Sequence, residues 1–112
     1  MEPLTPAVFH ILLVLADGEK HGYGIMQEVA EQTRQQVIMG PGTLYGTLKR
    51  MLESQLVEEC GERADTSLND ERRRYYRLTK RGYRAAVVEA ERLQALLRIA
   101  RGKSLLGRPR TE

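Results

Sequence analysis

Apolar residues recur at helical spacing in four stretches of the chain, and glycine and proline separate these stretches. The first predicted helix runs to about Ala16, with Thr5 as its N-cap and Pro6 at the first helical position. It is apolar on nearly every side, and such a helix must be covered on more than one side. The surplus apolar surface predicts contact with the C-terminal helix, with a second subunit, or with both.

The break Gly40-Pro41-Gly42 separates the second and third predicted helices. The second covers roughly residues 21–35, and the third runs from about residue 42 or 43 to 54. One face of the third helix is apolar at helical spacing and consists of Leu44, Leu48, Met51 and Leu52. The opposite face is polar or small and consists of Thr43, Gly46, Lys49 and Arg50, with Tyr45 on its flank.

Two stretches of β character follow the third helix and predict a hairpin. The strands cover residues 56–62 and 72–78, and the second contains the β-favouring pair Tyr75-Tyr76. The link between them, residues 63–71, is polar and too long for a tight turn. We therefore expect this link to be mobile.

The last predicted helix has Thr79 as its N-cap and ends near Gly102. A heptad-like seam of residues spaced by three and four runs along it: Tyr83, Ala86, Ala90, Leu93, Leu97 and Ala100. The seam would pack within the chain or against a second subunit; it would serve less readily as the wall of an effector pocket. The expected fold class is mainly α with a β wing: a winged helix-turn-helix domain over 1–79, a dimerisation helix over 80–102 and a flexible tail over 103–112.

Charge adds a second signal, because a net charge of +3 over 112 residues is concentrated in one region. The cations of this region are Arg72, Arg73, Arg74, Arg77, Lys80, Arg81 and Arg84. Such a cluster suits a polyanion such as DNA, and it equally suits a solvated basic face. The single cysteine, Cys60, excludes an intramolecular disulfide, and no signal-peptide pattern is present, which together predict a reducing cytoplasm. No apolar run reaches the roughly 20 residues that a membrane helix needs.

The order of helices and hairpin suggests how the chain would meet DNA. In a helix-turn-helix module the second helix of the pair enters the major groove. Lys49 and Arg50 of the third helix could reach phosphates or guanine edges, and Gly46 would permit a close approach. In the hairpin, alternation places Arg73 on one side and Arg72 and Arg74 on the other, and a narrow minor groove attracts arginine. The alternative is an ordinary basic surface.

Two tyrosines and a proline complete the candidate DNA contacts. Tyr23 and Tyr45 could bond phosphates through their hydroxyls, or they could pack against the protein. The complete set of candidate DNA contacts is Tyr23, Pro41, Thr43, Tyr45, Gly46, Lys49, Arg50, Arg72, Arg73 and Arg74.

Candidates for metal binding or catalysis are few. His10 and His21 are the only histidines, and no cysteine or carboxylate cluster lies near them at metal-ligand spacing. His21 more readily starts the second helix or touches DNA. The sequence has no nucleophile elbow, phosphate-cradling glycine loop or carboxylate dyad, so we expect neither an enzyme nor a bound metal or cofactor. The acidic neighbours of Cys60 disfavour a reactive thiolate. A sequence-specific DNA-binding regulator and a protein-interaction module that binds DNA weakly both remain open.

Several segments, in this order, resemble the PadR family of bacterial transcriptional regulators. They are Leu4-Thr5-Pro6, His21-Gly22-Tyr23-Gly24-Ile25, Gly40-Pro41-Gly42-Thr43-Leu44-Tyr45 with Leu48, Leu56-Val57, and Arg73-Arg74-Tyr75-Tyr76-Arg77-Leu78-Thr79 with Gly82. The resemblance extends from about residue 4 to residue 100, and the single C-terminal helix is similar to that of the family's short subgroup.

The resemblance implies a homodimer whose C-terminal helix packs across the first helix of the partner. It implies repression of a nearby gene or the protein's own operon through double-stranded DNA, which for a two-fold dimer means a pseudo-palindromic operator. It also implies release by a small aromatic or hydrophobic effector, as in many members. By position it implies DNA contacts at Tyr23, Thr43, Tyr45 and Lys49. The expected dimer interface joins the seam to apolar residues of the first helix: Val8, Ile11, Leu12 and Leu15.

Overall fold

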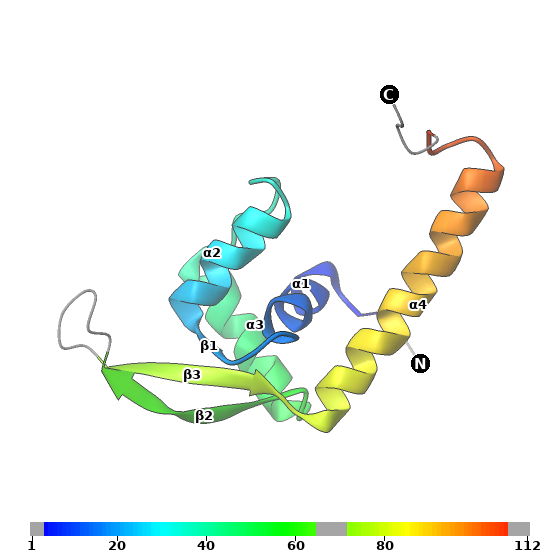
Figure 1. Ribbon diagram of the computed structural model, residues 1–112. Helices are drawn as coiled ribbons and strands as arrows, with labels where there is room; N and C mark the ends of the chain where they lie inside the picture. The colour runs from blue at the N-terminus through cyan, green and yellow to red at the C-terminus, as the bar shows by residue number, and fades with distance from the viewer. Residues whose placement is uncertain (1–3, 65–71, 108–112) are drawn as a thin grey trace.

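A computed structural model of the protein describes residues 4–64 and 72–107. The helices are α1 (Pro6–Leu15), α2 (Gly22–Gln32), α3 (Pro41–Glu53) and α4 (Lys80–Gly102). The strands are β1 (Lys20–His21), β2 (Val57–Ala64) and β3 (Arg72–Leu78). The β2–β3 hairpin extends to one side of α1, α2 and α3, and α4 extends to the other side (Figure 1). The expected mainly α, winged helix-turn-helix fold is confirmed.

The sheet contains one strand more than the sequence analysis predicted. Strand β1 pairs antiparallel with β3, with Lys20 opposite Tyr76 and His21 opposite Tyr75, so the strand order is β1-β3-β2. A strand of two residues is too short to show alternation, which explains why the pattern missed it. The pairing of β1 with β3 connects the start of α2 to the wing.

The helix ends agree with their capping residues. Thr5 caps α1 by accepting a hydrogen bond from Val8 N, and Thr79 caps α4 by accepting one from Gly82 N, as predicted. Helix α2 ends at Gln32 rather than near residue 35, because Arg34 and Gln35 have φ values of 52° and 66°, outside the helical region. Helix α3 begins at Pro41, slightly earlier than predicted, since proline is well accommodated in the first helical turn.

The core lies between α1, α2, α3 and the inner face of the sheet. Its fully buried side chains include Ile25 and Val29 of α2, and Leu44, Leu48 and Met51 of α3. These three residues of α3 belong to the apolar face that the sequence predicted.

Three residues of the expected dimer interface are buried within a single chain. Ile11 and Leu12 are 0% exposed and Leu15 is 3% exposed within a single chain. They pack into the hydrophobic core, so they offer no surface to a second subunit. Val8 is half-buried, and Leu13 on α1 is 43% exposed. The sequence pattern could not separate these sides of α1, because the helix is apolar nearly all round.

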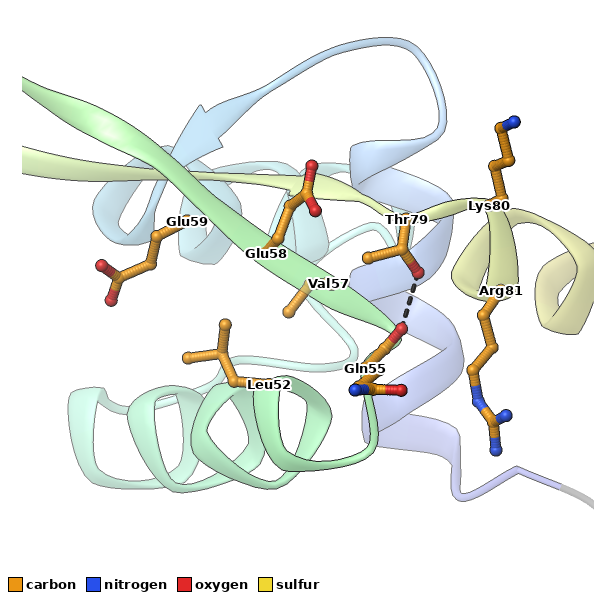
Figure 2. Close-up of a pocket in the computed structure, with 8 residues that line it drawn as sticks. All are labelled: Leu52, Gln55, Val57, Glu58, Glu59, Thr79, Lys80 and Arg81. Carbon is orange, nitrogen blue, oxygen red and sulfur yellow. Dashed lines mark hydrogen bonds between the residues drawn. The ribbon is translucent and has the colours of Figure 1, made fainter.

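A close junction fixes the start of α4 to the turn that follows α3. The Thr79 hydroxyl donates to the carbonyl oxygen of Gln55 at 2.6 Å (Figure 2). Thr79 N donates to the carbonyl oxygen of Leu56 at 3.1 Å. Gly82 lies against the same peptide, and a β-carbon there would overlap the Leu56 oxygen and lie 3.0 Å from its carbonyl carbon. Only glycine allows this approach of α4 to the winged domain.

Beyond this junction, α4 packs against α1, with Ala85 and Glu89 buried, and then extends away from the other helices (Figure 1). Glu89 is 5% exposed, and its carboxylate accepts two hydrogen bonds from Arg92. Helix α4 ends in a turn in which Leu105 N donates to Ala100 O at 2.9 Å. Residues 103 and 104 therefore form a turn at the start of the predicted flexible tail, whereas residues 108–112 and the hairpin link at 65–71 lie outside the described residues.

Candidate nucleic-acid interface

The outer face of α3 consists of the residues that the sequence predicted to face DNA. Thr43, Lys49 and Arg50 are exposed, and no residue in the described part of the chain forms a salt bridge with either cation. Gly46 lies among them, and a β-carbon added there would meet nothing within 4 Å. Pro41 is exposed at the first turn of the helix. This face is exposed and positively charged, and its charges are available to phosphate or guanine.

Tyr45 lies at the edge of this face and is held by the start of α2. Its side chain is packed so closely on Gly22 that a β-carbon at position 22 would overlap the Tyr45 hydroxyl. Tyr45 is 48% exposed, so one part of its ring packs and the rest faces solvent. Tyr23, the residue after Gly22 in α2, is 46% exposed. Each tyrosine is therefore placed both to contact the protein and to reach a ligand.

His21 fixes the first turn of α2, which carries Tyr23. Its Nδ1 accepts a hydrogen bond from Gly24 N at 3.0 Å, and its ring meets Tyr75 edge-on with centroids 5.3 Å apart. The expectation that His21 starts this helix is confirmed. Only the neutral imidazole of His21 can make this cap, because Nδ1 must accept the hydrogen bond from Gly24 N.

The wing carries its cations beside carboxylates. Arg77 Nε donates to Glu58 Oε2 at 2.6 Å, and these residues are opposite each other in the β2–β3 register. The hydrogen bond from Arg77 to Glu58 raises the pKa of that guanidinium, which stays charged. Arg74 lies 3.5 Å from Glu59 and keeps a side chain that is 63% exposed. Carboxylates thus offset part of the positive charge at the base of the wing.

Arg72 and Arg73 are the first residues of β3, at the end of the hairpin that is far from α4 (Figure 1). In the ladder they are opposite Ala64 and Arg63. The backbone therefore brings these two predicted contacts to the outer end of the wing, with Arg74 next to them in the strand.

Behind the interface, Tyr76 of β3 belongs to the hydrophobic core. It is 5% exposed, and burial raises the pKa of its hydroxyl, with smaller effects of the same sign from Glu59 and Tyr45. Sequence reasoning placed Tyr76 in the strand but gave no sign of its burial, because the burial depends on how the helices pack on the sheet. Among the described residues, no group of three or more histidine, cysteine or carboxylate side chains could hold a metal ion.

Residues 11–87 match the model of the transcriptional regulator PadR-like family. The chain belongs to this family. Its fold is that of solved PadR-like regulators, such as one from Clostridium difficile, with a TM-score of 0.69, 24% identity, and coverage of 92% of this chain and 100% of that one. A Streptococcus transcriptional regulator gives a TM-score of 0.71 at 21% identity, covering 87% and 90% of the two chains.

Bacillus subtilis PadR, solved in complex with operator DNA, has a TM-score of 0.64 and 18% identity to this chain. The match covers 98% of this chain and 52% of the Bacillus protein, so this PadR-like chain spans about half of that relative. No curated protein matches the chain in sequence. Within residues 4–64 and 72–107, no helix is long and apolar enough to cross a membrane.

Proposed function

We propose that this PadR-like regulator is a homodimeric repressor that binds a pseudo-palindromic operator. The supporting observation is the outer face of α3, where Lys49 and Arg50 lie exposed without salt-bridge partners in the described chain. Helix α3 enters the major groove, with Gly46 close to the base edges. Residues 1–79 bind DNA, and residues 80–102 join the subunits.

The remaining contacts are arranged around α3. Tyr23, Pro41, Thr43 and Tyr45 bind the phosphate backbone beside the groove, where hydroxyl and backbone donors fix the position of a protein on DNA. Arg72, Arg73 and Arg74 of the wing reach the adjacent minor groove. The operator complex of Bacillus subtilis PadR supports DNA as the partner for this fold.

The dimer rests on apolar surface that the chain leaves exposed. Tyr83 and Leu97 of the predicted seam are 58% and 50% exposed, and Leu96 and Ile99 beside them are 48% and 55% exposed. Burial of such side chains stabilises an interface at about 25 cal/mol for each Å² removed from water. The proposed interface joins these residues to Val8 and to the rest of the seam: Ala86, Ala90, Leu93 and Ala100.

An effector would act through the apolar groove between α1 and α4. This groove has a volume of about 340 Å³, and its lining includes Phe9, Leu13 and Leu93. Its size falls within the usual range for small-molecule sites, which supports release from DNA by a small hydrophobic or aromatic compound. His10 Nδ1 is buried there and has no hydrogen-bond partner among the described residues.

The test is a fluorescence-anisotropy titration with the DNA upstream of the protein's own gene and with a scrambled fragment of equal length. Replacing Lys49 and Arg50 by alanine should weaken specific binding by about 100-fold, because one base-edge contact contributes roughly tenfold or more. The matched control replaces Arg34 and Lys103, two exposed cations outside the proposed DNA contacts and the proposed dimerisation helix, and should keep the specificity. Unchanged binding by the Lys49/Arg50 variant would show that α3 does not bind the operator.

A further inference from the structure

A second groove lies between the end of α3 and the first turns of α4, apart from the proposed DNA face. It has a volume of about 420 Å³. Three separate segments of the chain contribute apolar side chains to it: Leu4 before α1, Leu56 after α3, and Ala85 with Val88 on α4. Val88 is 46% exposed. The groove is therefore an open, mostly apolar site of the size that holds a small molecule.

Two guanidinium groups, those of Arg81 and Arg84, border this apolar surface. Both side chains are exposed, and neither forms a salt bridge with a residue that the structure describes. Figure 2 shows the Arg81 side chain extending away from the start of α4 to the level of Gln55, which follows α3. By contrast, Arg77 and Arg92 each bind a carboxylate.

The position of these cations is electrostatically unfavourable in the absence of a ligand. Arg81 and Arg84 lie in the first turns of α4, where the helix dipole disfavours positive charge, and no acidic residue lies in the first turn. The adjacent hollow in Figure 2, of about 560 Å³, shares Arg81 with this groove and is also lined by Glu58 and Glu59, but each of these carboxylates already pairs with an arginine of β3. The groove at Val88 has cations only.

The other polar groups at the groove already have partners. The Ser54 hydroxyl donates to Arg50 O at 2.8 Å, and Leu56 O accepts from Thr79 N. The guanidinium groups are therefore the donors left for a ligand, and a guanidinium binds a carboxylate or sulfonate through paired hydrogen bonds.

From this charge and shape we propose that the groove between α3 and α4 binds an amphipathic anion, a small molecule with an apolar body and one acidic head. The body lies on Leu4, Leu56 and Val88, and the head binds Arg81 and Arg84. Such a ligand would contact both the end of the proposed DNA-reading helix and the start of the proposed dimerisation helix. If the proposed function holds, its binding alters DNA affinity, and DNA alters its affinity by the same factor.

The experiment compares three probes with the same ten-carbon chain and different heads: decanoate, decanol and decyltrimethylammonium. Each is titrated into the full-length protein below its micelle concentration, and binding is followed by calorimetry and by the amide NMR signals of Leu56, Ala85 and Val88. Decanoate should bind about tenfold more tightly than decanol, and decyltrimethylammonium should bind most weakly. The signals of all three residues should shift with decanoate.

The matched variants are Arg81→Gln with Arg84→Gln, and Arg98→Gln with Arg101→Gln. The first pair should reduce decanoate affinity to that of decanol, whereas the second, which removes equal charge from the far end of α4, should change it less than twofold. Equal affinity for all three probes would overturn the proposal, as would signal shifts centred on Leu96 and Ile99. Because these readouts use no DNA, they test the groove even if the protein fails to bind an operator.

Discussion

The approach of Gly82 to the Leu56 peptide offers the sharpest test of how α4 is positioned. In Gly82→Ala the new β-carbon overlaps the Leu56 oxygen, so either α4 or the turn after α3 must move. Two hydrogen bonds of Thr79, to Gln55 O and Leu56 O, then lengthen or break, at about 1 kcal/mol each. Overpacking adds about 1–3 kcal/mol, and the better helix propensity of alanine returns about 1 kcal/mol.

We therefore expect Gly82→Ala to lower the free energy of unfolding by about 2–4 kcal/mol, measured by urea denaturation followed by circular dichroism. The control is Gly102→Ala on the same helix, where a β-carbon meets nothing within 4 Å. It should leave stability unchanged or raise it by up to about 1 kcal/mol. If the two variants are equally stable, the contact with Leu56 does not constrain α4 and the reasoning fails.

Three further predictions concern single side chains. The hydrogen bond from Arg92 lowers the pKa of Glu89, so the carboxylate stabilises the fold at neutral pH and this contribution is lost as pH falls below about 4. The stability advantage of the parent over Glu89→Gln should accordingly shrink between pH 7 and pH 3 in thermal unfolding; a constant difference would contradict it. His21→Ala removes the cap on Gly24 N and should cost about 1 kcal/mol, whereas His21→Asn should keep most of it. Leu48→Ala empties a fully buried site and should cost about 2–5 kcal/mol by urea titration, and a loss below 1 kcal/mol would show that the core collapses around it.

Much of the fold could be predicted because its signals are local. Helix α4 begins after Thr79, as the N-cap rule indicates, and strand β3 covers the stretch that its alternation marked. The buried face of α3 followed from apolar spacing, and the same spacing placed Lys49 and Arg50 on the outside. Caps, strand alternation and helical periodicity each act over a few residues, so a single sequence carries them.

The remaining features depend on contacts between distant segments. Strand β1 exists only because β3 supplies its partner, and the inner side of α1 is defined only once α2 and α3 pack on it. Glu89 looks like one of many surface charges on α4, and its burial follows from the way α4 crosses α1. The groove with Arg81 likewise combines segments that no local pattern connects.

The contact between Tyr45 and Gly22 links two positions that belong to different helices, and it carries an evolutionary consequence. A larger residue at position 22 requires either that the half-exposed Tyr45 ring moves or that position 45 becomes smaller, so we expect substitutions at the two sites to be coupled among descendants of this sequence. Position 45 lies beside the surface that we expect to select the operator. If a smaller residue replaces Tyr45 and changes the operator preference, it also opens space that a new side chain at position 22 can fill. The order of the two substitutions therefore decides which evolutionary routes remain open.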